Sequence, residues 1–274
     1  MSAVFFRNVQ LGVCLNLGFL TLASATFIQE DFSGATLNSS IWGATNTSGA
    51  AAPSQAGGGL TTSVTTSGQN QRSLIYSVAT DFDFTVQPLT LSANISSLGG
   101  VGALSQPVNR YLLIGSFGTN TETLSRYYPG SELRFGVWLS AGQTNVVNYL
   151  EVGTVRIGNI TTTRQIYSGD LTAMSLTLNG TAYSVSASGT GGFSVGTGNS
   201  FNGTLANVIA SEYDGDFRFA MGAANSYQGT VTTGASAVWD SVSVVPEPGT
   251  LALLAIGAGG LIASRRRLRF SRCA

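Results

Sequence analysis

Residues 174–187 read MSLTLNGTAYSVSA, two runs in which apolar and small polar residues alternate on either side of Asn179 and Gly180. Alternation with a period of two places successive side chains on opposite faces of a β-strand. Asn-Gly between two such runs is a strong signal for a two-residue β-hairpin, because both residues accept the positive φ of a tight turn. The stretch therefore predicts two antiparallel strands, Met174 to Leu178 and Thr181 to Ala187.

The same alternation recurs at short intervals along the chain. In LRFGVWL, at residues 133–139, every odd position is apolar, and residues 89–95 keep the same period. No helical period of comparable length occurs between residues 26 and 245. Ten or so strands separated by turn residues predict an all-β fold, a two-sheet antiparallel sandwich. The further strand-like runs are Leu60 to Thr66, Leu74 to Ala79, Tyr111 to Phe117, Val146 to Val152, Leu171 to Leu178, Tyr183 to Ala187, Phe217 to Met221 and Val238 to Val244.

The composition excludes several classes of chemistry. The chain has no histidine and no lysine, so it can form neither a histidine-dependent nucleophile pair nor an imidazole metal site nor a Schiff base. Any acid–base chemistry must rest on Asp, Glu or Tyr. Residues 26–245 hold seven arginines against twelve acidic residues, a net charge of −5, which argues against a nucleic-acid partner. Both cysteines, Cys14 and Cys273, lie outside this region, so it contains no disulfide.

The N-terminal 25 residues have the pattern of a secretory signal peptide. Arg7 opens a short positive region, residues 9–22 are almost wholly apolar, and small residues occupy positions 23 and 25. We expect signal peptidase to cleave after Ala25. The chain then divides into a signal peptide at 1–25, an ectodomain at 26–245 and a C-terminal tail at 246–274.

The tail combines a proline pair, an apolar segment and a cluster of arginines. Pro246 and Pro248 interrupt regular structure. Residues 250–263 are apolar or small and would span about 21 Å as a helix, short of the ~30 Å of a bilayer core. The cluster that follows would stay on the cytoplasmic side, and it begins with Arg265, Arg266 and Arg267. The tail therefore predicts a short C-terminal transmembrane helix that anchors weakly.

Pro246-Glu247-Pro248, a short apolar helix and an arginine cluster, in this order, resemble the PEP-CTERM sorting signal of bacterial exported proteins. The resemblance implies transient anchoring in the bacterial inner membrane and processing near these three residues by an exosortase-type peptidase. The protein would then reach the cell surface or the extracellular space. Because that sorting system accompanies exopolysaccharide production, a place in a biofilm matrix is also implied.

The two ends of the ectodomain carry a second resemblance. Residues 30–42 read EDFSGATLNSSIW, residues 217–222 read FRFAMG, and residues 237–244 read AVWDSVSV. The opening and closing patterns look like the paired first and last strands of concanavalin A-like lectin and glucanase jelly rolls. The hairpin at 176–185 also resembles one of that group. The resemblance implies a jelly-roll sandwich, and we take no activity from it.

One acidic group could carry catalysis or bind a cation. Glu212, Asp214 and Asp216 share a face if their segment is extended. The jelly-roll glucanases carry E-x-D-x-E, in which the outer glutamates are nucleophile and acid/base, and here Asp216 replaces the last glutamate. Because Asp214-Gly215 is typical of a turn, we interpret the acids as solvated and expect no catalytic residue. Calcium binding by these acids, or by Asp81 and Asp83, is an alternative, but neither spacing resembles a defined calcium loop, so we expect no cofactor.

Aromatic residues are the other candidates for ligand contact. Trp138 and Trp239 keep the core-facing period of their strands, so we expect them to be buried, whereas Trp42 could stack on a sugar. Tyr127-Tyr128-Pro129-Gly130 is a turn with exposed aromatics, and we interpret Tyr127 and Tyr128 as the candidate ligand-binding residues.

Three functions remain after these exclusions. We expect an exported, non-catalytic module that binds extracellular polysaccharide. The alternatives are a glycan hydrolase that uses Glu212 and Asp216, and a structural matrix protein without a small ligand.

Overall fold

The computed structural model describes residues 28–64, 71–79, 82, 84–85, 87–99, 108–115, 132–139, 148–156, 159–194, 198–206, 208, 218–224 and 235–246. Within these ranges the chain forms sixteen strands, and no helix there is long and apolar enough to cross a membrane. The predicted signal peptide and the predicted C-terminal helix lie outside these ranges and stay predictions.

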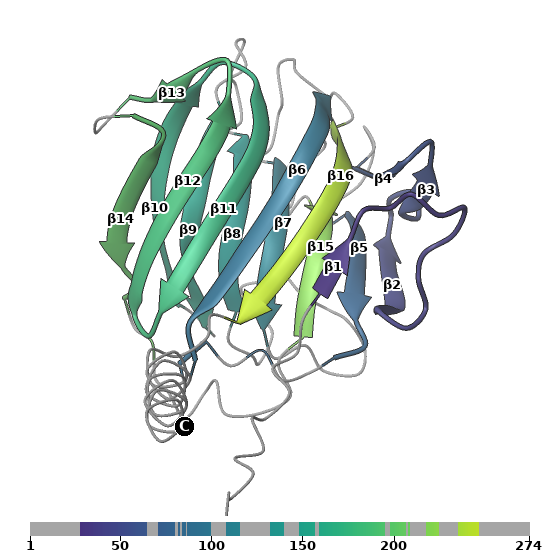
Figure 1. Ribbon diagram of the computed structural model, residues 1–274, viewed down its shortest axis with the longest axis horizontal. Coiled ribbons are helices and arrows are strands. Elements are labelled where there is room, and N and C mark those ends of the chain that lie inside the picture. Colours follow the sequence, from purple (N-terminus) through teal and green to yellow (C-terminus); the bar gives the residue numbers. More distant parts are fainter. Residues whose placement is uncertain are drawn as a thin grey trace, which may run out of the picture.

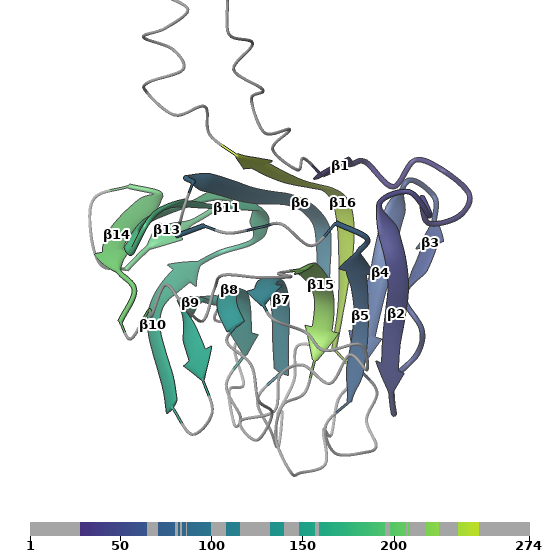
Figure 2. The same ribbon diagram turned by 90° about the horizontal axis from the view of Figure 1, so that it is seen from below.

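The strands form two antiparallel sheets of eight strands, which lie face to face (Figures 1 and 2). Sheet A has the order β14 (Ser200–Thr204), β12 (Ala182–Gly189), β11 (Leu171–Asn179), β6 (Leu89–Gly99), β16 (Ala235–Pro246), β4 (Gly59–Val64) and β3 (Ser54–Ala56), with β1 (Ile28–Glu30) also pairing with β16. Sheet B has the order β13 (Gly192–Phe193), β10 (Asn159–Ser168), β9 (Asn148–Arg156), β8 (Glu132–Leu139), β7 (Val108–Gly115), β15 (Arg218–Ala224), β5 (Arg72–Ser77) and β2 (Trp42–Ser48). The predicted all-β, two-sheet jelly-roll sandwich is confirmed.

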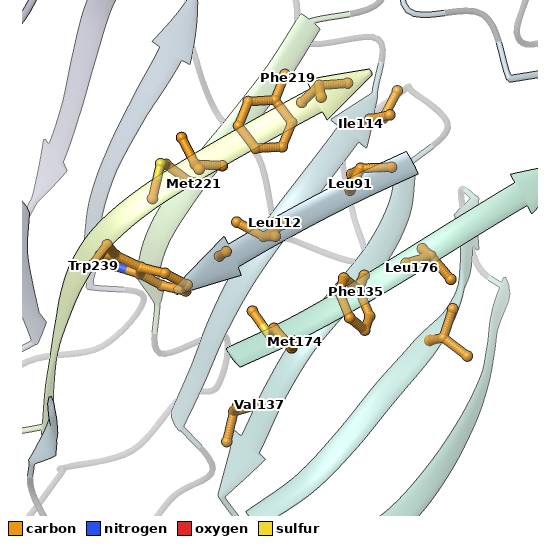
Figure 3. Packing of buried hydrophobic residues seen from close by; sticks show 14 of the residues in the cluster. Leu91, Leu112, Ile114, Phe135, Val137, Met174, Leu176, Phe219, Met221 and Trp239 are labelled. Carbon is orange, nitrogen blue, oxygen red and sulfur yellow. The ribbon is translucent and has the colours of Figure 1, made fainter. Parts of the chain in front are cut away.

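The inner faces of the two sheets form one hydrophobic core. Alternate residues of β6, such as Leu91, point inward, and so do Leu176 of β11 and Phe135 of β8 (Figure 3). Trp239 is fully buried there, and its indole N–H donates to the Thr62 hydroxyl at 2.9 Å. Each large apolar side chain buried in this way contributes about 1.5–3 kcal/mol of transfer free energy.

The predicted hairpin at residues 174–187 is present, but its turn is displaced by one residue. Asn179 still pairs with Ala182, so the loop is Gly180-Thr181 instead of the predicted Asn179-Gly180. Gly180 has φ 58°, and it therefore takes the first loop position, where a positive φ is required. Asn179 remains the last residue of β11.

The first and last strands pair as predicted, but of the stretch 30–42 that indicated the first strand only Glu30 lies in β1, because residues 31–41 form turns and irregular backbone before β2. Ile28 of β1 lies opposite Val244 of β16, and Glu30 lies opposite Val242. Strands β2, β10 and β14 were not predicted, because TNTS, TTTRQ and SFNGT lack a clear apolar alternation. Their backbone pairs with neighbouring strands that do show the alternation.

A buried arginine crosses the sandwich near one end. Arg110 lies on the core side of β7 and is 1% exposed. Its guanidinium donates to the carbonyl oxygens of Gly99 and Ser236, the latter at 3.0 Å, and both acceptors belong to sheet A. Burial lowers the pKa of Arg110 to about 10. The side chain thus ties β7 to β6 and β16, and it serves the fold.

Candidate functional site

Most of the residues singled out in the sequence lie outside the part of the chain that the structure describes. Tyr127 and Tyr128, the acids Glu212, Asp214 and Asp216, and the pair Asp81 and Asp83 are all in this group. So are Ala25, Glu247, Pro248 and Arg265 to Arg267, whereas Pro246 ends β16. The side chain of Trp138 is likewise not described.

The other two tryptophans are core residues. Trp239 is buried as predicted. Trp42, which the sequence left as a possible sugar contact, is 5% exposed and stacks on Phe32, with ring centroids 6.2 Å apart. It also packs against Phe219 of sheet B, so it cannot present a face to a ligand.

The outer face of sheet B holds a second buried cluster that the sequence did not reveal. Leu74, Tyr76, Tyr111, Ala220 and Ala224 are buried on the side of the sheet away from the main core. Polar residues share this face, because Arg134 and Glu151 alternate with the core residues of β8 and β9. An outer sheet face ordinarily carries solvated side chains. This face differs, because its central residues are buried.

Tyr111 lies between two glycines in its row across the sheet. Its cross-strand partners are Gly136 of β8 and Gly222 of β15. A Cβ at Gly136 would lie 1.9 Å from the Arg110 carbonyl oxygen, and one at Gly222 would lie 2.1 Å from that of Ser73. A residue with a side chain does not fit at either position. The Tyr111 ring therefore has no side chain directly opposite it on β8 or on β15. The guanidinium carbon of Arg134 lies over this ring, 5.6 Å from its centroid.

An ion pair on β9 and β10 extends the cluster toward solvent. Glu151 and Arg164 are directly opposed, and Arg164 Nε donates to Glu151 Oε2 at 2.5 Å. The Glu151 side chain is 1% exposed, whereas that of Arg164 is 39% exposed. The buried carboxylate therefore holds in place a guanidinium that solvent can still reach.

Three further residues surround Arg164 on the same face. Tyr149 and Ile166 are directly paired on one side, and Thr162 lies on the other, beside Gly153. All three are partly exposed. We call Tyr149, Thr162, Arg164 and Ile166 the β9–β10 patch. It combines an aromatic ring, an apolar side chain, a hydroxyl and a charged planar donor, groups that can contact both the apolar faces and the hydroxyls of a sugar.

The outer face of sheet A is chemically different. Ser200, Ser186, Ser175, Ser92 and Ser243 are directly opposed in turn across β14, β12, β11, β6 and β16. Neighbouring side chains hydrogen-bond one another, as in the 2.7 Å contact between the hydroxyls of Ser92 and Ser243. This face offers small hydroxyls without aromatic rings, which makes it a suitable place for control substitutions.

The described residues do not assemble a metal site. They contain no group of three or more acidic, cysteine or histidine side chains placed to hold an ion.

Sequence reasoning missed the β9–β10 patch because its residues look like ordinary outward-facing positions. Arg164 stands in TTTRQ, and Glu151 is the polar member of an alternating run. Interior glycines, such as Gly136 and Gly153, were the available signal, since glycine weakens a strand unless space is needed there.

The C-terminal segment carries a known sorting motif. Residues 244–267 match the PEP-CTERM protein-sorting motif, a range that contains Pro246 to Pro248 and Arg265 to Arg267. The chain is thus an exported protein that transits the membrane, and the motif implies processing by an exosortase. No curated protein is significantly similar to the chain in sequence.

Among solved structures, the chain is similar to a prokaryotic β-1,3-1,4-glucanase (lichenase) derived from a mouse hindgut metagenome. The TM-score is 0.48 at 8% identity, over 81% of this chain and 100% of that one. It is also similar to the PL7 alginate lyase AlyA1 from Zobellia galactanivorans, with a TM-score of 0.42 at 12% identity, over 69% and 78% of the two chains. At these identities we carry no activity over from either protein.

Proposed function

We propose that this exported protein is a non-catalytic module that binds extracellular polysaccharide through the β9–β10 patch. One observation carries the proposal: Arg164 is partly exposed beside Tyr149 while the buried Glu151 holds its guanidinium. A fixed guanidinium gives up less conformational freedom on binding than a mobile one, so its hydrogen bonds to sugar hydroxyls contribute more. Tyr149 would supply the stacking surface.

The setting of this module follows from the sorting motif. Signal peptidase would remove residues 1–25, an exosortase would process the tail, and the domain would remain at the cell surface or in an exopolysaccharide matrix such as a biofilm. We propose no nucleic-acid partner, since the ectodomain is acidic. We also propose no cofactor, since neither acidic spacing in the sequence resembles a defined calcium loop. Tyr127 and Tyr128 are proposed as additional ligand contacts.

A glycan array followed by calorimetry on the processed protein tests the proposal. We expect Tyr149→Ala to weaken glycan binding by about 1–2 kcal/mol, in line with the stacking of other planar ligands on aromatic residues. We expect a similar loss of about 1–2 kcal/mol for Arg164→Ala, because it removes the hydrogen bonds from the guanidinium to the sugar. Ser184→Ala, on the outer face of sheet A, is the matched control and should bind as the wild type does. Tyr127→Ala and Tyr128→Ala test the second set of contacts.

A reducing-sugar assay separates binding from hydrolysis. We expect no sugar release from β-glucans, and Glu212→Gln should leave glycan affinity unchanged. Hydrolysis that Glu212→Gln abolishes would establish the glycan hydrolase instead, because the two carboxyl groups of such a site act as a unit. If no glycan binds and the patch variants behave as wild type, the structural matrix role replaces our proposal.

A further inference from the structure

The sorting motif and the folded sandwich overlap. The motif match begins at Val244, while β16 continues to Pro246, so three residues belong to both. The first proline of the Pro-Glu-Pro sequence is therefore already part of the last strand.

These three residues are held by neighbouring strands. Val244 lies between Leu91 of β6 and Ile28 of β1, and it is fully buried. Val245 is opposite Thr90, and Pro246 is opposite Leu89. Release of this end would expose the Val244 side chain and separate it from two strands at once.

Such pairing conflicts with recognition by a peptidase. An enzyme that binds an extended segment reads its backbone N–H and C=O groups and the alternate side chains. Val242 to Val244 are paired with β6 on one side and β1 on the other, and Val245 and Pro246 are paired with β6. The backbone groups that form these ladders are already engaged. Residues upstream of the Pro-Glu-Pro sequence therefore cannot enter an enzyme groove while β16 is docked.

We propose that the end of β16, Val244 to Pro246, must detach from β6 and β1 before the tail is processed, so that the folded sandwich restrains its own release from the membrane. The rate of processing then follows the population of molecules in which this strand end is open. This inference does not depend on glycan binding.

A spacer variant tests the restraint. About eight Gly and Ser residues, a flexible chain, are inserted after Val245 and followed by a second copy of Val244-Val245. The strand then keeps its own residues through Val245, and the Pro-Glu-Pro sequence keeps its two upstream neighbours beyond the spacer. The same number of residues inserted between Gly57 and Gly58, in the turn between β3 and β4, is the control. Pulse–chase labelling of the full chain in cells that contain the exosortase measures the rate of processing.

A disulfide variant tests the same point in the opposite direction. Thr90→Cys with Val245→Cys joins β6 to the end of β16, in a Cys273→Ser background that leaves this pair as the only cysteines after residue 25. Ser175→Cys with Ser186→Cys is the matched control, because these residues are also directly opposed on sheet A but do not involve β16. Reductant added during the chase opens either bond.

We expect the spacer variant to be processed about tenfold faster than wild type, the factor that corresponds to an opening free energy of about 1.4 kcal/mol for the strand end. The Thr90–Val245 disulfide should stop processing until reductant is added, and both controls should behave as wild type. Equal rates for the wild type and the spacer variant would overturn the proposal. Processing of the locked strand at the wild-type rate would also overturn it, because the peptidase would then act before folding or on the docked strand. Glycan binding by the processed forms is measured separately.

Discussion

Replacement of Gly136 by alanine tests whether the strands around Tyr111 require a residue without a side chain. An alanine Cβ would lie 1.9 Å from the Arg110 carbonyl oxygen and 2.8 Å from the Tyr111 Cα, both backbone atoms of β7. Ordinary contact begins near 3.5 Å, so β7 and β8 would have to move apart by about 1.5 Å. Strands in a sheet lie about 4.8 Å apart, and a separation of this size would break the local ladder.

The expected destabilisation follows from these distances. Loss of about two ladder hydrogen bonds costs roughly 2 kcal/mol, and overpacking of the row adds about 1–3 kcal/mol. We therefore expect Gly136→Ala to lower the free energy of unfolding by about 3–5 kcal/mol, measured by urea denaturation of the processed protein.

Gly43→Ala is the matched control for this measurement. Gly43 also lies in a strand, β2, but its added Cβ would meet the Val78 side chain at 3.1 Å, and Val78 is half-exposed and able to move. This change should alter the free energy of unfolding by less than about 1 kcal/mol. If Gly136→Ala proves equally mild, the close approach of β7 and β8 is not what requires glycine at this position.

Two buried or hydrogen-bonded side chains and the arginine cluster of the tail offer further tests. Thr62→Val removes the acceptor of the buried Trp239 indole N–H and should lower the free energy of unfolding by about 1–3 kcal/mol, measured by urea denaturation. Thr61→Val, at a half-buried position, is the control, and an equal loss in both variants would contradict this role of the Thr62 hydroxyl. Hydrogen bonds from the Ser33 backbone N–H and then its side chain lower the pKa of Asp31 below 3.8, so its carboxylate stabilises the fold above that pH and the contribution is lost as the pH falls through the lowered pKa. Asp31→Asn should therefore have a flatter stability profile between neutral and acidic pH, and identical profiles would refute the assignment. Replacement of Arg265, Arg266 and Arg267 by glutamine removes the charge that holds the end of the tail on the cytoplasmic side of the membrane. Unprocessed protein should then leave the membrane, which cell fractionation detects. Unchanged processing would argue against retention by these arginines.

The fold was largely predictable from local pattern. Alternation in stretches such as residues 89–95 and 133–139 indicates which side chains face a core, because the period of a strand is a local property of the backbone. The last strand also had a recognisable sequence, whereas the opening stretch 30–42 lies almost wholly after the first strand. Strands β10 and β14 were not predictable in this way, since their own residues lack the apolar alternation and they are strands because they pair with β9 and β12, which show it.

The candidate site required the tertiary structure. Glu151 and Arg164 are thirteen residues apart, and the β9–β10 register decides that they are directly opposed. Burial of the Glu151 carboxylate depends on the packing of the whole outer face of sheet B, which no local pattern encodes. The Gly180-Thr181 turn shows the same limit on a smaller scale, because Asn179 was equally acceptable as a turn residue.

The sequence by itself determined the C-terminal sorting motif, the absence of histidine and lysine chemistry, and the two-sheet architecture, because each is written in composition or in contiguous residues. The tertiary structure alone decided that Arg134 lies over Tyr111 and that Glu151 is buried beneath Arg164. It also decided that the first proline of the sorting motif lies in the last strand of the sandwich. These facts depend on strand register, which is chosen by the summed packing of both sheets and cannot be read from any single segment.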